Sequence, residues 1–197
     1  MVTADLPMDA VPWPAADADG ERALVRACAA GSPGAFEEII RRHQPRVARL
    51  VRRLLGWPED VEDVVQEVFM TVLSRSGRYR GESALGTWIT AIAVNRCRTW
   101  RRRVGVRFRG LRWMLARAEK AAAPADTEAI RRDRQRAVRA AILTLPVAYR
   151  EVIVLHYLED LPLDAIARIL GLRRNTLEVR LHRARQRLGV LLKGVQP

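Results

Sequence analysis

Apolar side chains recur along this chain at the three- and four-residue spacing of one face of an α-helix. The first clear start is Ser32-Pro33, which predicts an N-cap followed by the first residue of a helix. No segment alternates between apolar and polar residues for long enough to indicate a strand. The sequence therefore predicts an all-α protein.

Four helices are expected in the first half of the chain. One begins at Ser32-Pro33, a second runs from about Arg46 to Gly56, and Pro58 opens a third. A fourth follows Ser83, whose hydroxyl can serve as its N-cap. The apolar residues of the third and fourth helices are expected to face the core, namely Val61, Val64, Val65, Val68, Phe69, Val72, Leu85, Trp88, Ile89, Ile92 and Ala93.

A second helical unit is expected after residue 126. A helix that ends at Pro146 precedes one over residues 147–158, and two further helices are separated by Gly171. Small Ala167 permits a close helix crossing, and glycine can adopt the positive φ of a tight turn. This pattern predicts a helix-turn-helix, whose second helix normally enters the major groove.

The charge balance of the 197 residues points to a polyanionic partner, because 35 Lys and Arg against 22 Asp and Glu give a net charge of +13. No apolar run is long enough to cross a bilayer, so no membrane insertion is expected. No secretion signal is visible, and Cys28 and Cys97 are too few for a disulfide framework. These features favour a cytoplasmic protein.

Composition divides the chain into four segments. Residues 1–20 carry four Asp, three Pro and no Lys or Arg, and are expected to form a disordered acidic tail. Residues 21–103 hold the first helical domain, 104–126 a flexible basic linker, and 127–197 the second domain. The arginines around the start of the linker could bind phosphates or simply be solvated; they are Arg101, Arg102, Arg103, Arg107, Arg109 and Arg112.

Polar residues remain on the outer side of the last helix once Leu177, Leu181, Ala184 and Leu188 are assigned to its buried side. Arginine offers paired donors to guanine or phosphate, asparagine can address adenine, and Thr or Val can touch a thymine methyl. A solvated basic helix would carry a similar charge run, but the preceding Ala-xxx-Gly spacing favours DNA contact. The candidates are Arg173, Arg174, Asn175, Thr176, Glu178, Val179, Arg180 and Arg183.

One segment of this basic protein is acidic. Residues 59–67 carry five carboxylates and no cation, and Asp63, Gln66, Glu67 and Met70 share one helical face with Glu59. Attraction to the helix N-terminus explains carboxylates in the first turn, but it does not explain Glu67. DNA would repel this face, which is suited instead to a basic protein surface.

No catalytic or metal-binding motif is visible. His43, His156 and His182 are far apart, and no glycine-rich phosphate loop is present. We therefore expect a protein that is not an enzyme and takes no cofactor or metal. Trp88 and Trp100 follow a Gly/Ser/Arg/Tyr loop, where aromatic rings could stack on unpaired bases, although core packing is the plainer interpretation of Trp88.

Over residues 21–103 and 127–193 the chain resembles the extracytoplasmic-function sigma factors, the small two-domain members of the sigma-70 family. Several independent phrases in the same order carry this resemblance. They are Gly31-Ser32 before Ala35-Phe36, residues 62–69 (EDVVQEVF), Arg80-Gly81-Glu82-Ser83, Thr87-Trp88-Ile89 with Ile92-Ala93-Val94-Asn95, Leu145-Pro146 with Tyr149-Arg150-Glu151, and residues 180–185 (RLHRAR).

The resemblance implies that the chain directs core RNA polymerase to specific promoters and assists initiation. The first domain, region 2, would dock on the clamp coiled coil of the β′ subunit and open the minus-10 element. The second, region 4, would sit on the β flap and read the minus-35 element. An anti-sigma factor is the further partner implied. The alternative is a free-standing helix-turn-helix regulator with an N-terminal helical sensor bundle; a small helical enzyme would need a convergent polar site, and none can be named.

The resemblance also assigns residues. It places Asp63, Gln66, Glu67 and Phe69 on the polymerase-docking helix, and it assigns the minus-10 element to Tyr79, Arg80, Gly81, Glu82, Ser83, Trp88 and Asn95. Two positions depart from the family pattern. Glu178 stands where a lysine is common, and Arg173 where a capping Ser or Thr is common. A carboxylate at position 178 either accepts a hydrogen bond from cytosine N4 or turns away from the bases.

Overall fold

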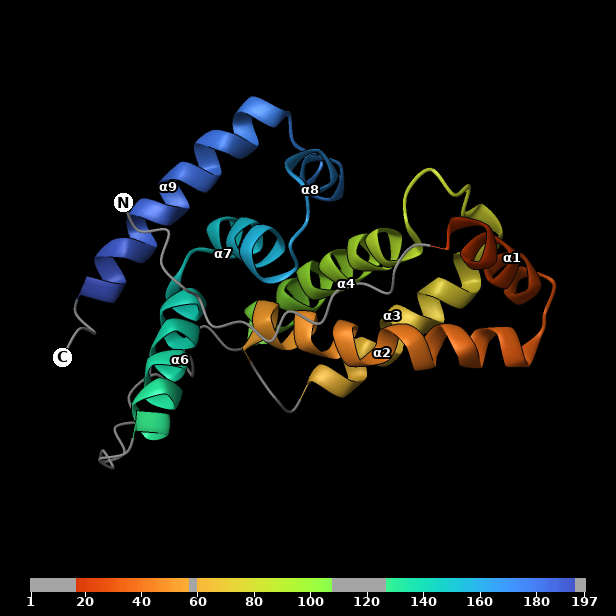
Figure 1. Ribbon diagram of the computed structural model, residues 1–197, viewed down its shortest axis with the longest axis horizontal. Coiled ribbons are helices and arrows are strands. Elements are labelled where there is room, and N and C mark those ends of the chain that lie inside the picture. Colours follow the sequence, from red (N-terminus) through yellow and green to blue (C-terminus); the bar gives the residue numbers. More distant parts are fainter. Residues whose placement is uncertain (1–16, 57–59, 108–126, 194–197) are drawn as a thin grey trace.

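The computed structural model describes residues 17–56, 60–107 and 127–193. Within them every regular element is helical, which confirms the predicted fold class. One group contains α1 (Ala18–Ala29), α2 (Pro33–Leu55), α3 (Val61–Arg75), the short 3₁₀ turn η1 (Ser76–Arg78) and α4 (Leu85–Arg107). The other contains α6 (Thr127–Thr144), α7 (Val147–Ile153), the π-helical turn η2 (Val154–Leu158), α8 (Leu163–Leu170) and α9 (Arg174–Lys193). The groups lie at opposite ends of the molecule and meet at its middle (Figure 1).

Helix α2 is continuous where the sequence predicted two helices. It starts as expected, because the Ser32 hydroxyl accepts a hydrogen bond from the Ala35 amide, and it ends at Gly56, which is left-handed with φ +77°. Pro45 lies inside it and lacks the amide hydrogen that one intrahelical bond would need. Buried residues on both sides of Pro45 belong to one core, so packing keeps the helix continuous.

The N-terminus of α4 is capped by α1, and the expected Ser83 cap is wrong. Ala84 occupies the N-cap position, since its carbonyl accepts the Trp88 amide, and Ser83 lies one residue before it. The buried Glu21 carboxylate accepts the Leu85 amide at 2.9 Å. A carboxylate is favourable at a helix N-terminus because it meets unpaired amides and the positive end of the dipole.

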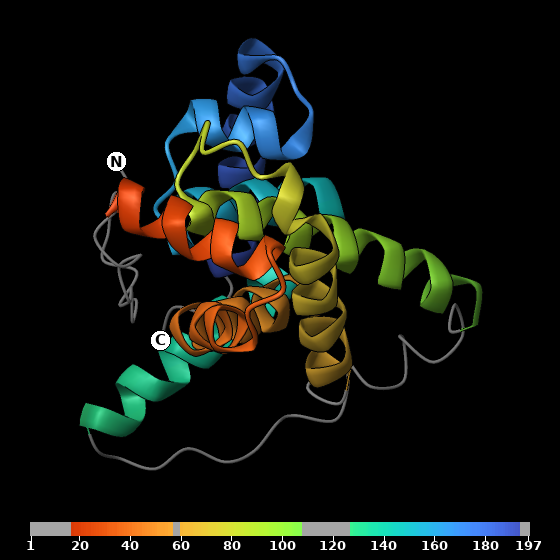
Figure 2. The same ribbon diagram turned by 90° about the vertical axis from the view of Figure 1, so that its right-hand side faces the viewer.

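The core residues predicted for the third and fourth helices are buried, except that Trp88 is only half-buried. Buried residues of the second half continue the same hydrophobic cluster, with Leu145, Ile153, Leu155 and Ile166 among its largest fully buried members. Figure 2 shows α8 and the start of α9 above α4. The two groups meet along both α4, which contacts α8, and α2, which contacts α6 and η2.

The predicted helix-turn-helix is confirmed in α8 and α9. Gly171 joins the two helices in the left-handed conformation, with φ +67°, and its amide points at the Ala167 and Arg168 carbonyls. The residues assigned to the inner side of α9 are buried, namely Leu177, Leu181, Ala184 and Leu188. The opposite side of the helix is therefore left for solvent or a partner.

Segment boundaries differ in detail from those expected. Helix α1 begins at Ala18, inside the segment expected to be a tail, and residues 1–16 lie outside the described part of the chain. Helix α4 continues to Arg107, so Arg101, Arg102 and Arg103 lie on a helix and not in a linker. Pro58, Arg109 and Arg112 lie outside the described residues, and α3 begins at Val61. No helix in the described ranges is long and apolar enough to span a membrane.

Candidate nucleic-acid interface

The loop between η1 and α4 carries the residues assigned to the minus-10 element. The Tyr79 hydroxyl donates to the Ser83 carbonyl at 2.7 Å, and Arg22 of α1 donates to the Gly81 carbonyl at 3.1 Å. Gly81 has φ +72°, and a Cβ there would overlap the Arg22 side chain, so this backbone requires glycine. One hydrogen bond thus joins the two ends of the loop, and a second holds its middle.

Aromatic rings flank this loop on the α4 side. The rings of Tyr79 and Trp88 lie 5.3 Å apart between centroids at an interplanar angle of 50°, and both residues are half-buried. Burial raises the pKa of Tyr79, so its hydroxyl keeps its proton and remains a donor. Arg80 and Glu82 are exposed beside the rings, and Asn95 is exposed two turns further along α4. The structure therefore gathers the predicted loop residues and leaves Asn95 at some distance along the helix.

Sequence reasoning missed the α1 residues that support this loop. Glu21 and Arg22 are adjacent in sequence and contact residues about 60 positions away, the Leu85 amide and the Gly81 carbonyl. Neither residue belongs to a recognisable motif. Only the packing of α1 against α2, η1 and α3 brings them into reach, so no local sequence signal could have identified them.

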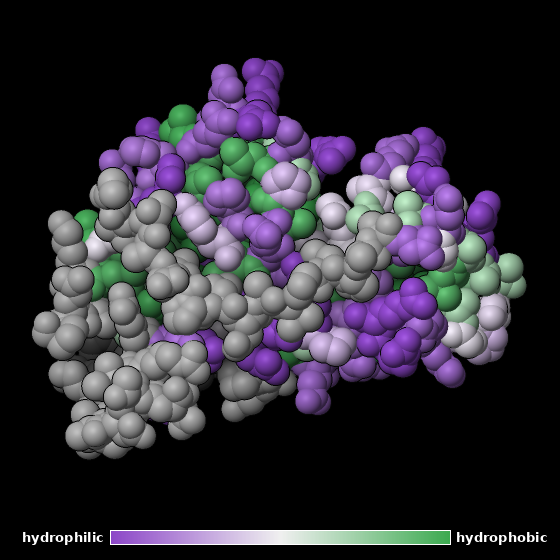
Figure 3. Space-filling model, in the orientation of Figure 1, coloured by the Kyte–Doolittle hydropathy of each residue, from purple (hydrophilic) through white to green (hydrophobic). Residues whose placement is uncertain are grey.

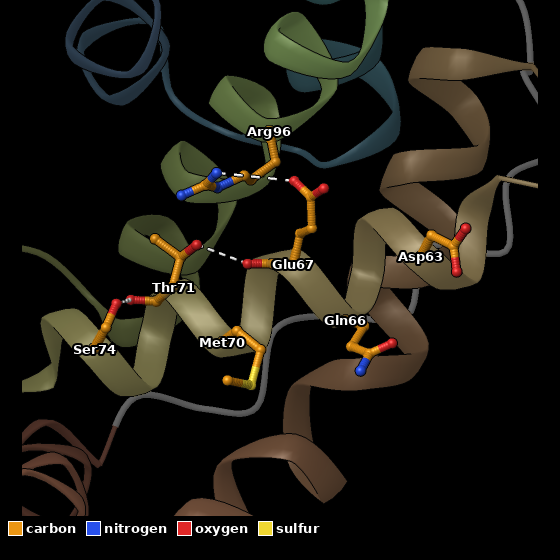
Figure 4. Close-up of a pocket in the computed structure, with 7 residues that line it drawn as sticks. All are labelled: Asp63, Gln66, Glu67, Met70, Thr71, Ser74 and Arg96. Atoms are coloured by element: carbon orange, nitrogen blue, oxygen red, sulfur yellow. Dashed lines mark hydrogen bonds and ion pairs between the residues drawn. The ribbon is translucent and has the colours of Figure 1, made fainter. Parts of the chain in front are cut away.

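The acidic face of α3 lines a shallow surface pocket of about 580 Å³. Its lining residues are Asp63, Gln66, Glu67, Met70, Thr71 and Ser74 of α3 with Arg96 of α4 (Figure 4). Met70 is 56% exposed and lies beside these carboxylates. The face therefore offers a partner both negative charge and an apolar contact.

Two of the residues that the resemblance assigns to polymerase docking are not freely accessible, and one of them, Phe69, also belongs to the predicted core stripe. Phe69 is only 5% exposed and packs in the core, because its position on α3 lies beside Val65 and Val72 on the inner side. Glu67 is half-buried, and its carboxylate lies 3.8 Å from Arg96 and 3.0 Å from Arg103. Asp63 and Gln66 are exposed.

Helix α9 presents almost all of the predicted reading residues to solvent. Arg180 is half-buried. The other seven are exposed, namely Arg173, Arg174, Asn175, Thr176, Glu178, Val179 and Arg183. Hydrophilic side chains accordingly cover the end of the molecule where α8 turns into α9 (Figure 3). Val179 is 51% exposed, which leaves an apolar surface available for a thymine methyl group.

The Glu178 carboxylate is occupied by a neighbour on the same helix. Arg174 Nε donates to it at 3.0 Å, and Arg174 Nη1 donates to Asp164 of α8 at 2.6 Å. Both carboxylates raise the pKa of Arg174. The guanidinium is thus oriented from two sides, with its Nη2 group left to donate outward.

The described residues contain no cluster of His, Cys, Asp and Glu that could hold a metal ion. Cys28 and Cys97 are both buried, and burial raises the pKa of Cys97 to about 12 and also raises that of Cys28. A thiol that keeps its proton is a poor nucleophile and metal ligand. Both cysteines therefore serve as small core residues.

Two family models match the chain in consecutive segments. Sigma-70 region 2 matches residues 39–106, and sigma-70 region 4 matches residues 135–188. The ECF RNA polymerase sigma factor SigM of Mycobacterium tuberculosis is 31% identical over 169 residues, which cover 86% of this chain and 83% of that protein. The chain belongs to the ECF sigma factors of the sigma-70 family.

Solved structures agree with this assignment. CnrH, determined in complex with the cytosolic domain of CnrY, has a TM-score of 0.66 and 27% identity, covering 90% of this chain and 100% of that one. The sigma factor RpoE from Bartonella quintana, determined with the anti-sigma factor NepR, shares the fold with a TM-score of 0.63 and 22% identity, covering 80% of this chain and 96% of that one. An ECF sigma factor accounts for both halves of the chain, whereas a free-standing regulator would leave the region 2 match unexplained.

Proposed function

We propose that this ECF sigma factor docks on core RNA polymerase through region 2, here residues 21–103, and reads promoter DNA with both of its regions. The observation that carries the proposal is the exposed acidic face of α3, in a protein whose net charge is +13. Asp63 and Gln66 contact the clamp coiled coil of β′, with Met70 beside them. Charge complementarity at such a surface chiefly sets the association rate and the choice of partner.

The loop of residues 79–83 captures unpaired bases of the minus-10 element. Its support from Arg22 and its flanking rings at Tyr79 and Trp88 provide a rigid platform on which a flipped base can stack. A preformed loop loses little entropy on binding, which favours capture of a strand that is only briefly open.

Region 4, residues 127–197, sits on the β flap and reads the minus-35 element with α9. Arg174, Asn175 and Val179 offer base-edge contacts, and Arg183 grips a phosphate. The protein performs no chemistry itself, works in the cytoplasm and is controlled by an anti-sigma factor. RpoE, which shares its fold, was solved with the anti-sigma factor NepR, and CnrH was solved with the cytosolic domain of CnrY.

A single substitution tests the docking surface. Asp63→Arg reverses an exposed charge on α3 and is expected to weaken binding to core polymerase by about tenfold or more, with helical content unchanged. Glu37→Arg makes the same change at an exposed position of α2 and serves as the matched control. Equal binding by the wild-type protein and both variants would remove the role assigned to α3.

A further inference from the structure

Helix α1 lies beside the loop that the proposed function assigns to unpaired bases. The loop leaves η1, which packs against α1, and arches to the start of α4 (Figure 1). Arg22 of α1 donates from Nη2 to the Gly81 carbonyl at 3.1 Å, so its guanidinium reaches the middle of the loop of residues 79–83. Helix α1 precedes residues 39–106, which match sigma-70 region 2. The family match therefore assigns no function to Arg22.

The position of the Arg22 side chain is fixed by the shape of the loop. Gly81 has φ +72°, a conformation that residues with a Cβ rarely adopt. A Cβ at this position would also overlap Arg22 Nε, so the arginine occupies space that only glycine leaves open. The absence of a side chain at Gly81 thus lets a cation lie directly against the backbone of the loop.

Arg22 can hold the loop and still offer donors to a ligand. A guanidinium carries five N–H groups, and the Gly81 carbonyl accepts from one of them. The side chain of Arg22 is 48% exposed, and its Nη1 lies 3.6 Å from Asp19, which is 96% exposed. An ion pair as exposed as this one contributes little, so an anionic ligand can displace Asp19 without a large cost.

Positive charge gathers around the aromatic ring of the loop. Arg78 and Arg80 are exposed on either side of Tyr79 in sequence. Burial and Glu21 raise the pKa of Tyr79, whereas the charge of Arg22 lowers it, so Arg22 acts electrostatically at this residue. Sites for single-stranded nucleic acid combine aromatic rings, on which bases stack, with cations that bind the backbone. The loop has the ring, and α1 supplies a cation from outside it.

We propose that Arg22 is a DNA-binding residue, which holds the loop through the Gly81 carbonyl and binds a phosphate of the captured strand. This inference rests on the proposed function, in which the loop of residues 79–83 captures unpaired bases. Each base is tethered to a phosphate, so a base held at the loop brings negative charge to the rim where Arg22 lies. Helix α1 thereby becomes a third element of the minus-10 site, beside the loop and α4.

Forked promoter DNA tests this contact with the complete holoenzyme. The DNA carries a promoter that the holoenzyme uses, with one strand left unpaired through the minus-10 element, and each strand is tested in turn. Arg22→Gln removes the charge and keeps an amide donor for the Gly81 carbonyl; it is expected to weaken binding about five- to tenfold. Loss of one phosphate contact to a single strand should also reduce the slope of log K against log salt by about 0.7.

Arg26→Gln is the matched control. It makes the same change at an exposed position one turn further along α1 and is expected to leave both the affinity and the salt slope unchanged. Since both arginines are exposed, neither substitution should alter the free energy of unfolding appreciably. Equal affinities and equal salt slopes for the wild-type protein and both variants would overturn the proposal.

Neutral phosphates separate a direct contact from support of the loop. Methylphosphonate substitution removes the charge of one phosphate at a time along the unpaired strand. With the wild-type protein we expect at least one position where this substitution weakens binding severalfold. With the Arg22→Gln protein the same substitution should have no further effect, because the two changes remove one interaction. If both proteins lose the same factor at every position, Arg22 binds no phosphate.

Gly81→Ala distinguishes failure of this inference from failure of the proposed function. It distorts the loop itself and is expected to weaken binding of the forked DNA, while binding to core polymerase stays unchanged. If Gly81→Ala weakens DNA binding and Arg22→Gln does not, the loop captures DNA without Arg22 and only the inference fails. If neither variant weakens it, the loop does not capture unpaired DNA and the function proposed for it fails.

Discussion

His43 is the residue whose titration bears most clearly on stability. It is 1% exposed, and burial together with nearby Arg42 and Arg46 lowers its pKa to about 4. The imidazole of an unfolded chain titrates near 6.5. The unfolded chain therefore binds more protons between pH 6.5 and 4, and this group reduces the free energy of unfolding as the pH falls through that window. The full loss is roughly 3 kcal/mol.

The His43→Gln variant should lack this part of the pH dependence. Urea unfolding at pH 7 and pH 4.5 measures it, and the drop in the free energy of unfolding should be smaller in the variant than in the wild-type protein. His182→Gln changes an exposed histidine of α9 and should retain the full drop. An equal drop in all three proteins would show that His43 titrates normally.

Arg174 and Glu178 should act as one reading unit. Since Glu178 orients the Arg174 guanidinium, Glu178→Ala and Arg174→Ala are expected to relax discrimination at the same minus-35 base pair. Loss of a direct base contact costs about 1–3 kcal/mol, and the arginine variant should lose more than the glutamate variant. Selection of promoter variants with reconstituted holoenzyme measures both; Arg183→Ala should instead weaken all promoters about equally.

If Glu178→Ala and Arg174→Ala relaxed discrimination at different base pairs, this coupling would be contradicted. A glutamate that accepts from cytosine N4 would show its effect at a base pair of its own, independent of Arg174. The sequence left open whether Glu178 contacts cytosine or turns away from the bases. The structure shows a third arrangement, in which Glu178 forms an ion pair with Arg174, one helical turn earlier, and orients its guanidinium.

At the scale of elements, α1 supports both α4 and the loop of residues 79–83. Glu21→Ala removes the carboxylate that accepts the buried Leu85 amide and is expected to lower the free energy of unfolding by about 1–3 kcal/mol. Glu37→Ala alters an exposed carboxylate of α2 and should change stability little. Urea unfolding at pH 7 compares the two. A Glu21→Ala protein as stable as the control would show that water replaces the cap without cost.

Elements with a continuous apolar stripe could be predicted from the sequence. The stripe of α3 and the Ala167–Gly171 spacing of the helix-turn-helix are local patterns, and both were identified correctly. The continuity of α2 through Pro45 was missed, because proline signals a break locally while packing on both sides decides otherwise. The α4 cap was missed for a related reason, since its carboxylate comes from Glu21, 64 residues earlier.

Contacts between the two regions could not be predicted from the sequence. Glu151 belongs to a phrase that resembles the family, but nothing local indicates that Arg98, 53 residues earlier, binds it. Glu159 and Arg46 are 113 residues apart. Pairs of this separation become visible only once helices are placed in space, whereas the surface residues of α9 follow from the periodicity of one helix.

For the whole molecule, specific promoter binding should depend on polymerase. Two small DNA-contacting regions lose entropy when they are ordered on separate elements, and docking on one rigid surface removes that cost. At physiological salt the isolated protein should show only weak, salt-sensitive DNA binding in a filter or mobility-shift assay, as expected for a chain of net charge +13. Tight, sequence-specific binding without polymerase would favour a free-standing regulator.

The measurement that most directly tests promoter-directing activity is transcription by core RNA polymerase with and without the purified protein, with start sites mapped across genomic DNA. We expect a defined set of starts that appears only when the protein is added, preceded by two shared sequence elements near positions minus 10 and minus 35. The Asp63→Arg protein should lose those starts, whereas the Glu37→Arg protein should keep them. Start sites identical to those of core polymerase alone would contradict the account.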